Sequence, residues 1–165
     1  MENYICKVAT KEERLAKLEY DKSMNPGEEK NWDTWINEFK NRPDNQRITY
    51  IGLLNNEIIC EVSAALVSND IQNADGLVDD KTAYLFAFRT NKEYRGKGYF
   101  SKLFKFMLND LKERGYEKAT LGVEPEYPEN KAIYFHYGFT EYIKDGIEVE
   151  PDGTKVNVEY YGKKL

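Results

Sequence analysis

The stretch that decides the fold is residues 94–115, which read YRGKGYFSKLFKFMLNDLKERG. Its apolar side chains recur at the spacing of one helix face, as Phe100, Leu103, Phe104, Met107, Leu108 and Leu111. Gly115 stands where a left-handed residue often ends a helix. The spacing predicts a helix over residues 100–114, entered through a turn that contains two glycines.

The turn before this helix has the composition of an anion-binding turn. Its glycines, Gly96 and Gly98, let backbone N–H groups approach an anion, and the first turn of a helix presents N–H donors without intrahelical partners. Further charge and a hydroxyl are supplied by Arg95, Lys97, Lys102 and Ser101. Neither the complete P-loop nor the complete dinucleotide-binding pattern is present. Two interpretations stay open: a pyrophosphate cradle, or a turn whose lysines face water.

Outward from this stretch, the pattern alternates between strands and helices. Strands are predicted at residues 4–8, 48–54, 57–67, 82–90, 119–123, 139–149 and 155–161, and further helices at 11–22, 28–40 and 129–137. Thr10 and Glu13 form a capping-box pattern at the first helix, and Asn55-Asn56 suits a tight hairpin turn. The strand at 82–90 is apolar on both faces, which is typical of the middle of a sheet. The order predicts a mixed α/β fold in a single domain, residues 1–165.

Composition and charge exclude several classes of protein. The chain has 165 residues, is 41% hydrophobic and carries a net charge of −5, which argues for a packed globule and against a nucleic-acid binder. Residues 89–105 hold six basic side chains and one acid, a basic island on an acidic chain that suggests an anionic ligand or a solvated helix face. The first ten residues lack an apolar core, no apolar run could span a bilayer, and two cysteines cannot make a zinc site alone. We therefore expect a cytoplasmic protein without metal, membrane or nucleic-acid partner.

Two motifs together resemble one enzyme family. Arg95-x-x-Gly98 after a strand is similar to motif A of the GNAT superfamily of acyl-CoA-dependent N-acyltransferases, and Tyr134 through Phe139 looks like the Tyr-x-x-x-Gly-Phe end of that family's next helix. The resemblance covers essentially the whole chain. It implies a largely antiparallel twisted sheet of about seven strands, splayed after the fourth, with about four helices. The chain departs from the motif at Phe100, which replaces a small residue, and at Asn130, which lies four rather than seven residues before Tyr134.

The resemblance also implies where acetyl-CoA would bind. The backbone of Phe88, Arg89 and Thr90 would pair with the pantetheine amides, and one of these N–H groups could polarise the thioester carbonyl. The pyrophosphate would be held by Arg95, Gly96, Lys97, Gly98, Tyr99, Phe100 and Ser101, with Asn130 as a further CoA contact. Tyr134 matches the family's proton donor to the leaving thiolate, with Tyr137 as the alternative.

The general base is open at this point. Glu124, just past the strand at 119–123, is the first candidate, and Glu61 on an earlier strand is the second. Either carboxylate could instead be an ordinary solvated surface residue, and the acceptor amine could also lose its proton to bulk water. His136, the single histidine, is expected on the surface or packed rather than in the chemistry.

The sequence thus predicts an N-acetyltransferase that moves an acetyl group from acetyl-CoA to a primary amine of a small molecule or peptide by direct attack. Acidity outside the basic island favours a cationic acceptor. Two other hypotheses stay open: an acyl-CoA-sensing module without turnover, and an α/β domain that uses its aromatic residues to bind a protein partner. The family resemblance makes a homodimer possible.

Overall fold

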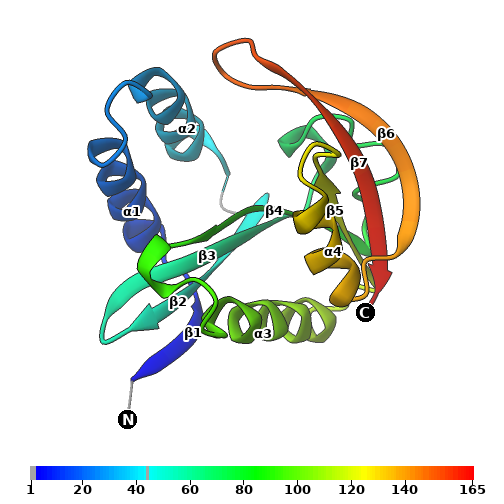
Figure 1. Ribbon diagram of the computed structural model, residues 1–165, viewed down its shortest axis with the longest axis horizontal. Coiled ribbons are helices and arrows are strands. Elements are labelled where there is room, and N and C mark those ends of the chain that lie inside the picture. The colour runs from blue at the N-terminus through cyan, green and yellow to red at the C-terminus, as the bar shows by residue number, and fades with distance from the viewer. Residues whose placement is uncertain (1–2, 44) are drawn as a thin grey trace.

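The computed structural model describes residues 3–43 and 45–165, and its centre is a seven-stranded sheet (Figure 1). The strands lie in the order β1-β2-β3-β4-β5-β7-β6. Their bounds are β1 Tyr4–Val8, β2 Arg47–Leu54, β3 Glu57–Ala65, β4 Thr82–Thr90, β5 Lys118–Val123, β6 Glu141–Val149 and β7 Lys155–Lys164. All neighbouring strands pair antiparallel except β4 and β5, which are parallel. The apolar strand β4 is the central one, as its two-faced hydrophobicity predicts.

In the described part of the chain, four α-helices cover the two faces of this sheet. They are α1 Lys11–Ser23, α2 Glu29–Asn41, α3 Tyr99–Glu113 and α4 Pro128–His136. In Figure 1, α1 and α2 lie above β2 to β4, and α3 lies below them. The apolar stripe of α3 is buried at Leu103, Phe104, Met107 and Leu111, all fully covered, so this helix anchors the larger core.

The first helix begins as its sequence predicts. Thr10 Oγ1 accepts a hydrogen bond from the Glu13 N–H at 3.1 Å, and Glu13 Oε1 accepts one from the Thr10 N–H at 2.9 Å. This reciprocal pair satisfies two N–H donors at the helix start. The second helix buries Trp32 and Ile36 against Leu18 of α1, so α1 and α2 form a small core of their own.

The parallel pairing of β4 and β5 stops halfway along β4. It runs from Thr82↔Lys118 to Leu85↔Leu121, after which the edge of β4 that faces β5 pairs with no other described strand. On its other side, β4 carries a bulge, because Ser63↔Phe86 is followed by Glu61↔Arg89. Within the bulge Ala87 has a φ of 57°, a left-handed conformation that L side chains rarely adopt. The sheet is therefore splayed after its fourth strand, as the resemblance implies.

Element bounds differ from the predictions mainly at strand ends. The third strand ends at Ala65 rather than residue 67, and the sixth begins at Glu141 rather than residue 139. Phe139 is fully buried and packs its ring against Phe104, with a centroid distance of 5.7 Å, so core packing and not strand pairing places it. The last short helix covers Pro128–His136, one residue earlier at each end than predicted.

Candidate active site

A cavity of about 780 Å³ opens at the splay. It is lined by β4 and the segment after it, by α3 and α4, and by the α1–α2 region. Seven predicted site residues line it: Phe88, Arg89, Thr90, Arg95, Phe100, Asn130 and Tyr134. Because no described strand pairs with this edge of β4, its backbone groups are open to an extended ligand that adds as a strand.

Tyr134 is a residue of α4, and its side chain lies over β4. Its ring packs on Phe88, with a centroid distance of 5.0 Å, and its hydroxyl makes no hydrogen bond with any residue that the structure describes. Burial, with a smaller contribution from Tyr137, raises the pKa of Tyr134 to about 12. The phenol therefore keeps its proton at neutral pH, and it is a weaker acid than a thiol, whose pKa is roughly 8.5. The alternative, Tyr137, lies instead against the Phe104 ring at 4.5 Å and does not line this cavity.

The glycine turn before α3 is exposed and left-handed at both glycines. Gly96 has a φ of 74° and Gly98, the N-cap residue of α3, a φ of 87°. A Cβ at either position would meet nothing within 4 Å, so open space lies over this backbone. Lys102 is the first residue of α3 whose N–H bonds back, to the Gly98 oxygen at 3.2 Å. The turn and the first turn of the helix thus have the form of an anion site.

Side chains around this turn divide into exposed and buried sets. Arg95 is exposed and its Nε donates to the Thr90 oxygen at 3.0 Å, which fixes the side chain beside the cavity. Lys97 is exposed, and Ser101 is partly buried. Tyr99 is buried and packs on Tyr4, whose hydroxyl donates to the Tyr99 oxygen at 2.8 Å. Its side chain therefore belongs to the core.

Phe100, which departs from the family motif, points into the aromatic cluster. Its ring lies 6.0 Å from Phe88 and 5.8 Å from Phe104, centroid to centroid. The bulky side chain therefore forms part of the cavity floor, as its place at the start of the apolar stripe predicts. Asn130 is exposed at the rim.

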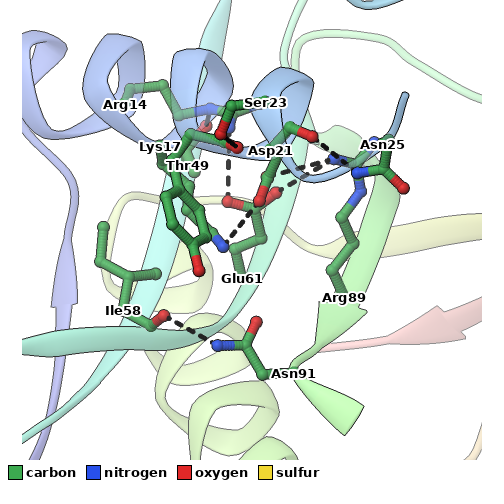
Figure 2. A network of polar contacts seen from close by, with 11 residues as sticks. Arg14, Lys17, Asp21, Ser23, Asn25, Thr49, Ile58, Glu61, Arg89 and Asn91 are labelled. Atoms are coloured by element: carbon green, nitrogen blue, oxygen red, sulfur yellow. Dashed lines mark hydrogen bonds and ion pairs between the residues drawn. The ribbon is translucent and has the colours of Figure 1, made fainter. Parts of the chain in front are cut away.

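A buried network of charges lies beneath Arg89 (Figure 2). Glu61 is 1% exposed, and its Oε2 lies 3.4 Å from the buried Arg14 guanidinium. The Arg89 Nη1 lies 3.8 Å from Glu61 Oε1 and 3.7 Å from Asp21 Oδ2. The Arg89 guanidinium also lies over Trp32, 4.6 Å from the ring centroid. Arg89 is thus held by charge and an aromatic face rather than by hydrogen bonds.

This network corrects one expectation for the general-base candidates. Glu61 is not on a solvated surface, because its position opposite Arg89 in the β3–β4 pairing places it under α1. Arg14, an unremarkable position in the sequence of α1, is the partner that permits its burial. Glu124 follows β5, is partly exposed and does not line the cavity of Tyr134, so a catalytic role for it stays a prediction.

A second cavity, of about 660 Å³, meets the first at Trp35 and Arg89, which line both. Its walls come from α2, the middle of β4 and the end of β6, and include Glu148 and Glu150. Glu148 Oε2 accepts hydrogen bonds from the Tyr160 hydroxyl at 2.7 Å and from Tyr84 at 3.3 Å. The sequence interpretation missed both carboxylates, since they alternate with exposed residues on an edge strand and carry no motif.

The comparisons with known proteins agree with this fold. Residues 12–139 match the Acetyltransferase (GNAT) family, and the chain belongs to that family. A search of curated protein sequences finds no relative of this chain. The similarity to solved structures is strong in fold and weak in sequence.

Three solved structures illustrate the similarity. The ribosomal-protein-S18-alanine N-acetyltransferase from Escherichia coli has a TM-score of 0.70 at 14% identity, with 99% of this chain and 94% of that chain covered. A probable acetyltransferase from Staphylococcus epidermidis has a TM-score of 0.71 at 11% identity, with 99% of each chain covered. Arabidopsis thaliana NAA60, solved in complex with acetyl-CoA, has a TM-score of 0.70 at 11% identity, with 99% of each chain covered.

Proposed function

We propose that this GNAT acetyltransferase transfers an acetyl group from acetyl-CoA to a primary amine by direct attack, within a single domain that spans residues 1–165. The observation that carries the proposal is the meeting of an unpaired edge of β4 with an open glycine turn on one side and Tyr134 on the other. An extended thioester of CoA needs all three: amide partners, a pyrophosphate site and a proton donor for its thiolate.

The donor would lie along the open half of β4. In this proposal the backbone of Phe88, Arg89 and Thr90 pairs with the pantetheine, and the N–H groups from Gly96 to Ser101 receive the pyrophosphate. Arg95 and Lys97 add charge at the exposed turn, and Asn130 contacts CoA from the rim. The bulge at Ala87 supports an oxyanion role, because the extra residue leaves a backbone group outside the ladder beside the site of reaction.

Transfer then requires two proton movements. The neutral amine attacks the thioester carbonyl carbon, a C–N bond forms, and the C–S bond breaks as the tetrahedral intermediate collapses. The thiolate takes the Tyr134 proton, and the phenol is reprotonated from solvent. The amine's proton leaves to water or to a nearby carboxylate, for which Glu124 stays a candidate.

The acceptor, location and assembly of the protein belong to this proposal as well. None of the described helices has the length and apolar character to cross a membrane, and no metal-binding cluster of His, Cys, Asp or Glu occurs among the described residues. We propose a cytoplasmic enzyme that acts on a small-molecule or peptide amine. A homodimer stays a prediction.

An acetyl-transfer assay tests the proposal. Purified protein is mixed with acetyl-CoA and a panel of primary amines, with free thiol as the first readout and the acetylated amine, seen by mass spectrometry, as the second. We expect thiol release that depends on both amine and enzyme. Saturable acetyl-CoA binding without transfer to any amine of the panel would favour the sensing module instead, and absence of binding would overturn the donor site.

A further inference from the structure

The cavity of Tyr134, where we propose that acetyl-CoA binds, is here called the donor cavity. The second cavity has different electrostatic surroundings at its junction with the donor cavity and on the wall formed by the end of β6. Arg89 and Trp35 mark the junction, since they line both cavities. Glu148 and Glu150 line the second cavity and not the first. A molecule that reaches the thioester from the second cavity therefore passes both sets of side chains.

The junction has buried hydrogen-bond acceptors that the described residues leave unsatisfied. Glu61 Oε1 and Asp21 Oδ2 are buried without a hydrogen-bond donor, and each lies beyond hydrogen-bonding distance of the Arg89 Nη1. The Glu61 side chain is 2% exposed. Buried polar atoms of this kind require a donor, either water or a ligand. Both carboxylates lie beside Arg89 (Figure 2), but only Asp21 lines the first cavity, and Glu61 lines neither cavity.

The junction also carries excess positive charge. Arg14, Lys17 and Arg89 surround the two carboxylates of Asp21 and Glu61, so three cations face two anions. An ammonium group brought there is disfavoured relative to a neutral amine, which still has N–H groups to donate to Asp21. The junction thus selects the protonation state that the attacking nitrogen needs.

The β6 wall of the second cavity, in contrast, carries negative charge that favours a cation. Glu148 is positioned by two tyrosine hydroxyls, and the Glu150 carboxylate makes no hydrogen bond or ion pair with a described residue. Both carboxylates are partly buried, and burial together with the charges of Glu148 and Asp152 raises the pKa of Glu150. A cation between these carboxylates would offset their repulsion.

Of the other charged side chains on this cavity, Arg47 and Asp70 are paired with each other, whereas the Glu38 carboxylate makes no hydrogen bond or ion pair with a described residue. Arg47 Nε lies 2.9 Å from Asp70 Oδ2, and its guanidinium also covers the face of Phe86 at 4.4 Å. Because Arg47 and Asp70 are paired, neither of them neutralises the carboxylates of Glu148 and Glu150. The aromatic side chains Trp35 and Phe39 supply apolar surface for a hydrocarbon chain.

From this arrangement we infer that the acceptor is an aliphatic diamine: one nitrogen, neutral, lies beside Asp21 and Arg89, and the other, charged, lies between Glu148 and Glu150. The inference rests on the proposed function for its reactive end, and it adds the substrate class. A monoamine of the same length fills the same apolar surface but lacks the second ammonium. Its affinity is therefore lower.

Calorimetry of matched amines tests this inference without turnover. Diaminobutane and diaminohexane are titrated into the CoA-loaded protein and into the free protein, alongside butylamine and hexylamine. We expect the diamine to bind more tightly than its monoamine. The preference for the diamine is measured as the dissociation constant of the monoamine divided by that of the diamine. This ratio should fall about fivefold in Glu148→Gln and in Glu150→Gln, the loss expected for one partly solvated ion pair. Glu57→Gln, at the exposed first residue of β3, should leave the ratio unchanged.

Each outcome decides one claim. Equal affinity for diamines and monoamines, or a preference that survives both glutamate variants, overturns the diamine inference. Failure of every amine to bind overturns it as well, while intact acetyl-CoA binding and transfer to some other amine would leave the proposed function standing. If acetyl-CoA does not bind, the proposed function falls, and the titrations on the free protein still decide the diamine site. Glu150→Gln removes no hydrogen bond between described residues, so it keeps the test valid if Glu148→Gln fails to fold.

Discussion

The Tyr134→Phe variant separates chemistry from binding more cleanly than any other change in this protein. The substitution removes one hydroxyl that makes no hydrogen bond with a described residue and leaves the ring on Phe88. The free energy of unfolding should therefore change by less than about 0.5 kcal/mol. Acetyl-CoA affinity should stay within about twofold, because the pairing with β4 and the glycine turn does not involve the phenol.

Turnover should respond very differently. Loss of a positioned general acid lowers kcat by roughly 10²–10⁴-fold, which corresponds to about 3–5 kcal/mol of transition-state free energy. The assay is thiol release at saturating acetyl-CoA and amine, paired with an acetyl-CoA titration. Because the pKa of Tyr134 is raised to about 12, the wild-type enzyme should show no loss of rate from this group as pH rises from about 7 to 10.

Tyr137→Phe is the matched control, since Tyr137 lies on the same segment but against Phe104. It should retain most of the wild-type kcat. A Tyr134→Phe enzyme with near-normal kcat, or an equal loss in both variants, would refute the assignment of Tyr134 as proton donor.

Three further predictions follow from the fold. Gly98→Ala should lower the free energy of unfolding by about 1 kcal/mol because of its φ of 87°, and should also weaken acetyl-CoA binding. Gly115→Ala, with a φ of 96° at the other end of the same helix, should cost similar stability and leave the affinity for acetyl-CoA unchanged. Glu61→Gln should lower the free energy of unfolding by about 3 kcal/mol, measured in urea, because two guanidinium groups lose their buried counter-charge; wild-type stability in this variant would contradict the account of the network. The Thr10 N–H and a nearby lysine lower the pKa of Glu13, so its contribution to stability is full above its unfolded pKa and is lost as pH falls through the folded value; the stability difference between wild type and Glu13→Gln should shrink between neutral pH and pH of about 3.

The sequence predicted those parts of the fold that local patterns determine. The capping box at Thr10, the hairpin at Asn55-Asn56 with φ values of 50° and 69°, and the apolar stripe of α3 are all present. Each depends on residues within one or two turns of the chain. Seven predicted site residues, among them Arg95 and Tyr134, line one cavity because they belong to motifs with fixed spacing, and their role in binding acetyl-CoA stays a prediction.

The rest depended on contacts between distant segments. The burial of Glu61 needs Arg14 from a helix far earlier in the chain, and neither residue looks like a core position in its own element. Likewise, Glu148 and Glu150 join Arg89 on one cavity only because the β6–β7 hairpin lies beside β5, and in Figure 1 this hairpin arches towards the side of α2. Pairing of edge strands is weakly specified by a local pattern, so the second cavity could not be predicted.

The measurement that tests the central claim most directly is the titration of acetyl-CoA into the wild-type protein and into Arg95→Glu, by calorimetry and by thermal unfolding. We expect saturable binding of one acetyl-CoA per chain, with a raised Tm, and a large loss of both effects in the variant, because the new carboxylate would lie beside the glycine turn. An absence of both heat and thermal stabilisation in the wild-type protein, or binding that Arg95→Glu leaves unchanged, would contradict it.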